Sequence, residues 1–145
     1  MIVEAHELRQ RFAERVAALS GYEEADAPFD PGTAPANVAL RSFSVLLPQT
    51  LANGTRDRSG GAMEVKTRVI VRCQSAVNLA GPGRIAAMDL EMKAEAGMVR
   101  HMMKQGETWM YGLRVAFAGI ERVIMLGDEW LQTDVNFDVG HTVQL

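Results

Sequence analysis

The sequence Glu64-Val65-Lys66-Thr67-Arg68-Val69-Ile70-Val71-Arg72-Cys73 alternates between two kinds of side chain. Every second position is valine, threonine or cysteine, whereas charged residues and one isoleucine take the positions between them. Because successive side chains of a strand point to opposite faces, this alternation predicts a long strand with one apolar and one charged face. A sheet built around such a strand has one face against a core and the other in water.

A second strand precedes this one along the chain. Residues 41–47 place Phe43, Val45 and Leu47 on one side, and we expect Pro48 to end the strand because proline cannot donate a hydrogen bond to a sheet. Residues 49–62 contain a glycine-rich run without apolar side chains, which predicts a flexible, solvent-exposed loop. The strands 41–47 and 63–73 therefore form a long hairpin around that loop.

Two further strands are expected near the end of the sequence, over residues 120–126 and 129–141. Gly127 and Asp128 provide a turn between them. The last strand alternates cleanly between apolar or threonine positions and polar positions. Residues 109–119 fit a strand and a short helical piece equally well, because three apolar residues alternate there within a segment that also contains two glycines.

Two amphipathic helices complete the prediction. Over residues 3–20 the apolar side chains are spaced three and four apart, and Gly21 provides a left-handed end. Over residues 84–105 a similar stripe predicts a helical face that packs on the sheet. That second stripe consists of Ile85, Met88, Met92, Ala96, Val99 and Met103. Leu90, Met98 and Met102 lie outside it, so we expect them to pack on something other than the sheet.

These elements predict a single α+β domain over residues 1–145. Its length suits one domain with one core. Hairpins alternating with helices favour a mostly antiparallel sheet of four or five strands packed against two helices, in the order α-β-β-α-β-β.

The composition excludes several classes of protein. The net charge of −3 does not favour a nucleic-acid-binding protein, and a single cysteine cannot form an intramolecular disulfide. No apolar stretch approaches the roughly 20 residues that span a bilayer, and the first residues lack a signal-peptide pattern. We therefore expect an intracellular protein without membrane contact.

The chemistry-bearing residues are scattered, and we expect no catalytic residue, no bound metal and no cofactor. The three histidines fall in separate elements, and Cys73 lies on the apolar side of its strand. Glu91 and Glu95, one helical turn apart, are expected in solvent. Lys66, Arg68 and Arg72 form a basic stripe that nearby acidic residues dilute. The glycines at 81 and 83 are expected to cap the second helix.

The order of helix 3–20, hairpin 41–47 and 63–73, helix 84–105 and strands 120–126 and 129–141 resembles the tail terminator, or tail completion, proteins of long-tailed bacteriophages and phage-like tails. The resemblance implies an α/β subunit that forms a ring, usually a hexamer. Such a ring caps the tail tube, ends its polymerisation and joins the tail to head-completion or neck proteins. It also implies a place in the virion tail, assembly in the host cytoplasm and passage of DNA through the ring's lumen.

The resemblance assigns roles to particular residues. The loop 49–62, with Asn53, Arg56, Asp57 and Arg58, would contact a partner ring. The surplus apolar residues of the second helix, Leu90, Met98 and Met102, would form the interface between subunits, where adaptable methionine side chains are common.

Other functions remain open from the sequence. One is a small-ligand-binding domain or enzyme of unknown substrate, with a pocket between the second helix and the sheet. Others are a head–tail connector or neck protein, and a bacterial adaptor or toxin–antitoxin component.

Overall fold

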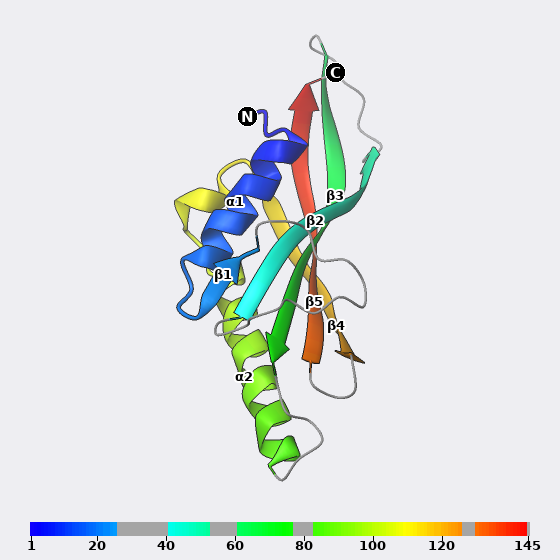
Figure 1. Cartoon of the computed structure of the whole chain (residues 1–145). Helices are drawn as coiled ribbons and strands as arrows, with labels where there is room; N and C mark the ends of the chain where they lie inside the picture. Colours follow the sequence, from blue (N-terminus) through cyan, green and yellow to red (C-terminus); the bar gives the residue numbers. More distant parts are fainter. Residues whose placement is uncertain (26–40, 53–60, 77–82, 126–129, 145) are drawn as a thin grey trace.

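The computed structural model describes residues 1–25, 41–52, 61–76, 83–125 and 130–144. Within them, five strands form one sheet and two helices lie on the same side of it (Figure 1). The elements in chain order are α1 (Ala5–Ala17), β1 (Tyr22–Glu24), β2 (Arg41–Ala52), β3 (Ala62–Ala76), α2 (Arg84–Met103), the 3-10 turn η1 (Thr108–Met110), β4 (Arg114–Met125) and β5 (Trp130–Gln144). The predicted α+β class, with a mostly antiparallel sheet against two helices, is confirmed.

The sheet has the strand order β1-β2-β3-β5-β4. β3 and β5 lie next to each other and pair antiparallel over their whole lengths, from Ala62 opposite Gln144 to Ala76 opposite Trp130. The alternating stretch 64–73 therefore lies near the middle of the sheet, as its pattern predicts. β1 was not predicted because three residues are too few to show a period, and it joins β2 in parallel.

Pro48 does not end β2, contrary to the prediction. The strand continues to Ala52, and the register with β3 shifts between Leu46 and Gln49, so Leu47 and Pro48 lie in a bulge. β1 pairs with only the first three residues of β2, so none of the described strands lies beside Pro48 on that side of β2. A bulge and a strand position without a neighbouring strand both tolerate a residue that lacks an amide hydrogen. Residues 49–52 and 62 therefore belong to strands, and only 53–60 of the predicted loop lie outside the described residues.

The ambiguous segment 109–119 contains both of the structures that its sequence allows. η1 is a short helical turn, and β4 begins at Arg114 rather than at residue 120. A bulge in β4 lies between Phe117 and Gly119, where the left-handed φ of +118° favours glycine. The chain thus turns and bends twice within twelve residues, which hides the strand period.

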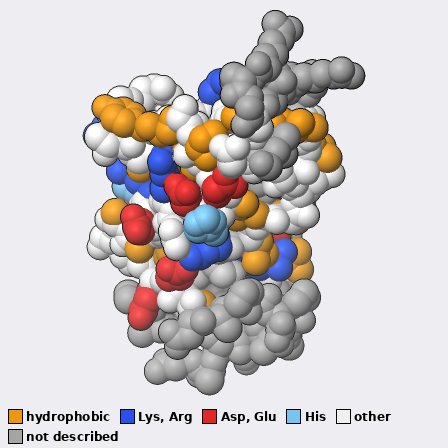
Figure 2. All heavy atoms as spheres, turned by 90° about the horizontal axis from the view of Figure 1, so that it is seen from above, with side chains coloured by type: hydrophobic (Ala, Val, Ile, Leu, Met, Phe, Trp, Pro, Cys, Tyr) orange, Lys and Arg blue, Asp and Glu red, His pale blue; other side chains and the backbone are white. Residues whose placement is uncertain are grey.

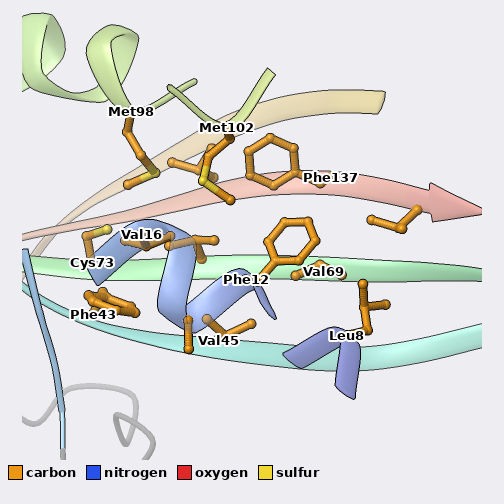
Figure 3. Close-up of a cluster of buried hydrophobic side chains, with 14 of the residues drawn as sticks. Leu8, Phe12, Val16, Phe43, Val45, Val69, Cys73, Met98, Met102 and Phe137 are labelled. Atoms are coloured by element: carbon orange, nitrogen blue, oxygen red, sulfur yellow. The ribbon is translucent and has the colours of Figure 1, made fainter. Parts of the chain in front are cut away.

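The core lies between the helices and the facing side of the sheet. Phe12 of α1 contacts Trp109 edge to face at 5.1 Å between ring centroids, and Phe137 of β5 at 5.5 Å. Figure 3 shows Met98 and Met102 reaching from α2 toward the same cluster, with Phe43 and Cys73 on the sheet. The buried position predicted for Cys73 is confirmed.

The first residues are held against the end of β5. The Val3 amide donates to the carbonyl of Thr142 at 2.8 Å. His141 Nδ1 donates to the Val3 carbonyl at 2.7 Å, since a carbonyl can only accept, and its Nε2 is hydrogen bonded to Thr67 Oγ1 at 2.6 Å. β4 begins opposite Gly140, so Val3 pairs beyond the end of β4. The helix begins at residue 5 rather than 3 because Val3 is used in this pairing.

The prediction that Met98 and Met102 lie on a subunit interface is wrong, because both side chains belong to the core. They are 1% and 0% exposed, and Glu95 on the same side of α2 is 4% exposed. Ile85 and Met92 of the predicted stripe are exposed instead. At 3.6 residues per turn, the buried face is rotated by roughly a quarter turn from the prediction. The prediction missed this rotation because the charge of Glu95 suggests a surface position, whereas Glu95 lies against the sheet.

The rotation of α2 predicts opposite effects of one substitution at two positions. Met98→Asp places an unpaired carboxylate in the core and should lower the free energy of unfolding by about 3–5 kcal/mol. Leu90→Asp should change it by no more than about 0.5 kcal/mol, because Leu90 is 61% exposed. Urea denaturation followed by circular dichroism measures both values. Similar losses in the two variants would contradict the observed rotation of α2.

Candidate functional site

A buried ion pair fixes α2 to the sheet. Glu95 accepts hydrogen bonds from Thr133 Oγ1 of β5 at 2.9 Å and from Arg122 Nε of β4 at 2.8 Å, and Arg122 Nη2 lies 2.6 Å away. The Glu95 side chain is 6% exposed and that of Arg122 is 40% exposed. The carboxylate is thus satisfied from two strands, which is how proteins accommodate a buried charge. The sequence prediction that Glu95 is solvated is wrong.

The N-terminal half of α2, residues 84–94, has exposed apolar side chains. Ile85 is 76% exposed, and Leu90 and Met92 are also exposed. In Figure 1 this half of the helix extends below the lower end of the sheet, whereas the half that carries Met98 and Met102 lies against it. Ile85 and Met92 share one side of the helix and Leu90 lies on another side. The exposed apolar surface is thus not confined to a single side.

The edge strand β4 adds further exposed apolar side chains. Phe117, Val123 and Ile124 are exposed. β4 pairs with β5 on one side, and the described residues provide no strand on its other side. Unpaired strand edges with apolar side chains are sites at which chains associate. β4 and the projecting half of α2 therefore both have the character of association surfaces.

A surface pocket lies between α1 and η1. Its volume is about 330 Å³, and it is lined by Arg11, Glu14, Arg15, Ala18, Thr108 and Trp109. The Arg15 guanidinium lies over the Trp109 ring, 5.9 Å from its centroid, which is a cation–π arrangement. We refer to these six residues as the Trp109 pocket. It lies elsewhere than the predicted pocket between the second helix and the sheet.

Arginine side chains hold the walls of the Trp109 pocket in place. Arg11 Nη1 donates to the carbonyls of Trp109 and Tyr111, at 3.2 and 2.6 Å. Arg15 Nη2 donates to the His101 carbonyl at 2.9 Å, and His101 Nε2 returns a hydrogen bond to the Arg15 carbonyl at 2.7 Å. The reciprocal pair joins α1 to α2. Hydrogen bonds within the protein therefore hold the residues that line the Trp109 pocket in place.

The predicted basic stripe is neutralised across the sheet. Arg72 makes a bidentate pair with Asp134 at 2.8 and 2.9 Å, and Arg68 pairs with Asp138 at 2.7 Å. The hydrogen bonds that Arg72 donates to Asp134 raise the pKa of Arg72 above its ordinary value. Figure 2 shows acidic and basic side chains intermixed on the end of the molecule seen from above. Neither the stripe nor this end presents a uniformly basic surface to phosphate groups.

Other predicted features carry no assembled chemistry within the described residues. No group of three or more His, Cys, Asp or Glu side chains is placed to hold a metal ion there. No helix in the described part of the chain is long and apolar enough to cross a membrane. The predicted partner-binding residues Asn53, Arg56, Asp57 and Arg58 lie outside the described residues.

Comparison with known proteins adds no assignment to these surfaces. No protein-family model matches the chain, and no curated protein matches it. Function is therefore inferred from the projecting half of α2, the β4 edge and the Trp109 pocket.

Two arginines of β4 offer a matched test of the buried ion pair. Arg122→Ala leaves the Glu95 carboxylate with Thr133 as its remaining partner and should lower the free energy of unfolding by about 1.5–3 kcal/mol. Arg114→Ala removes a 3.6 Å contact to Glu64 between exposed side chains and should cost less than about 1 kcal/mol. Equilibrium denaturation of both variants checks the difference. Equal losses would show that burial of Glu95 does not matter.

Proposed function

We propose that this chain is a structural subunit that assembles into a ring, and that the ring caps the tail tube of a bacteriophage or phage-like particle. The observation that carries the self-association is the exposure of Ile85, Leu90 and Met92 on the projecting half of α2. Apolar side chains on more than one side of a helix end that extends past the described strands favour contact with a partner. Exposed apolar groups of this kind are typical of protein association sites.

The assignment to a phage tail rests on the order of elements. α1, the long β2–β3 hairpin, α2 and the β4–β5 pair keep the order on which the resemblance to tail terminator proteins is based, with the short β1 added after α1. The proposed partners are further copies of this chain in a ring, by resemblance a hexamer, the tail tube protein and a head-completion or neck protein. The loop with Asn53, Arg56, Asp57 and Arg58 is proposed to contact such a partner. A head–tail connector or neck protein is the nearest alternative.

The proposed setting is the virion tail, after assembly in the host cytoplasm. DNA would pass through the lumen without being bound. This is compatible with the pairing of Arg68 and Arg72 by Asp138 and Asp134, which leaves little uncompensated positive charge on that part of the sheet.

A small-ligand-binding role is the second candidate, and the Trp109 pocket is the observation that favours it. Its volume of about 330 Å³ falls at the lower end of the range for small-molecule sites. A metabolite that raises the melting temperature of the protein would support this role, because a ligand selective for the native state stabilises it.

Tube polymerisation tests the proposed function. The purified protein, added to a polymerising tail tube protein from the same genome, should stop elongation and give tubes of limited length with a ring at one end. Tube lengths and end rings are measured by negative-stain microscopy. Unchanged tube lengths and bare ends would contradict the proposal.

Two exposed positions on different helices provide matched variants for the same assay. Ile85→Asp should abolish end rings, because it replaces an apolar side chain on the projecting half of α2 with a charge. His6→Asp changes an exposed residue of α1 outside the proposed interfaces and should leave rings and capping intact. An Ile85→Asp protein that caps as well as the wild type would remove this part of α2 from the proposed interface.

A further inference from the structure

The Trp109 pocket combines basic and aromatic groups. Arg11, Arg15 and the indole of Trp109 line it together with the carboxylate of Glu14. Outside the lining, Glu107 Oε2 lies 3.8 Å from Arg15 Nη1. The ring of Trp109 and the methyl group of Ala18 provide apolar surface beside the two guanidinium groups. A group that fits this site would carry a carboxylate next to apolar atoms, because guanidinium groups bind carboxylates and aromatic rings bind apolar side chains.

Two donors at this pocket lack acceptors. Arg15 Nε and Trp109 Nε1 are buried, and neither has a hydrogen-bond partner in the described part of the structure. Buried donors are almost always satisfied in folded proteins, and exceptions often mark a place where another group binds. Both residues already contact each other through the cation–π arrangement. Both residues belong to the lining of the pocket.

The projecting half of α2 presents the matching chemistry. Ile85, Asp89 and Met92 are spaced four and three residues apart, so they share one side of the helix. All three are exposed. We call them the α2 stripe. It places one carboxylate between two apolar side chains, in the arrangement that the Trp109 pocket requires.

The stripe and the pocket belong to different parts of the subunit. In Figure 1 α1 and η1 lie in the upper half of the molecule, whereas the N-terminal end of α2 lies at the bottom. A contact between two different surfaces joins one copy to the next in a head-to-tail manner. Repetition of such a contact closes into a ring when the rotation between copies allows it.

We propose that the Trp109 pocket of each subunit receives the α2 stripe of a second copy. Asp89 pairs with Arg11, and Ile85 and Met92 pack against Trp109 and Ala18. This inference rests on the self-association in the proposed function, and it specifies which two surfaces meet. The contact is heterologous, so one subunit uses both surfaces at the same time.

Two complementary variants test the pairing. In the first, Ile85→Ser with Met92→Ser removes the apolar groups of the stripe and leaves the pocket intact. In the second, Ala18→Glu fills the pocket with a like charge to Asp89 and leaves the stripe intact. Ile85, Met92 and Ala18 are exposed, so both proteins should keep the wild-type melting temperature. Thr108→Glu, at another exposed lining position, replaces Ala18→Glu if that variant does not fold.

Sedimentation velocity measures the outcome. Each variant alone should associate at least about tenfold more weakly than the wild type, since loss of 1.4 kcal/mol weakens association tenfold. An equimolar mixture should form a one-to-one dimer and nothing larger, because each protein retains a single working surface of opposite kind. His6→Ser, at an exposed position of α1 outside both surfaces, should assemble as the wild type does.

The other outcomes separate the two proposals. Wild-type protein that stays monomeric would overturn the ring and this contact together. Wild-type assembly that either variant retains in full would overturn this contact alone. The same conclusion follows if the two variants are monomeric and their mixture does not pair. Loss of assembly in the His6→Ser control would show that the effects are not specific to these surfaces and would also count against the contact.

Discussion

The carboxylate of Glu95 is the constraint on which the arrangement of α2 depends. A buried carboxylate requires partners, and Arg122 and Thr133 supply them from two neighbouring strands. This contact sets the rotation of α2, so Met98 and Met102 turn into the core while Ile85, Asp89 and Met92 turn outward. It also anchors only the middle of the helix, and the N-terminal half continues past the sheet. The exposed surface proposed for assembly is thus a consequence of how one charge is buried.

Sequence periodicity predicts the parts of this fold that follow a single rule. The alternation in 64–73 and in the last strand gives the two long strands β3 and β5, and the spacing of Leu8, Phe12 and Val16 gives the buried face of α1. Where two rules compete, the sequence misleads. Pro48 ends a strand in most settings, but in the bulge of β2 it costs no hydrogen bond. Glu95 suggests a solvated position because its partners lie 27 and 38 residues away in the sequence.

The candidate surfaces were less predictable than the fold. Leu90 was expected on an interface and is exposed, but Met98 and Met102 were assigned to it only because the buried face of α2 was misplaced. The Trp109 pocket had no sequence signal. It forms because Arg11 of α1 reaches the carbonyls of Trp109 and Tyr111, in the turn that the sequence left ambiguous. Arg15 of α1 reaches the His101 carbonyl of α2, which lies 86 residues further along the chain. Contacts of this range depend on the completed fold, so a pattern within one element cannot reveal them.

The central claim is that each subunit carries two different, complementary surfaces that close into a ring. Native mass spectrometry of the wild-type protein over a wide range of concentrations tests it most directly. A closed ring predicts a single assembled species larger than a dimer, at a fixed multiple of the 15.9 kDa subunit, whose mass does not grow with concentration. A monomer at every concentration, or a series of ever larger masses without a closed species, would contradict the claim.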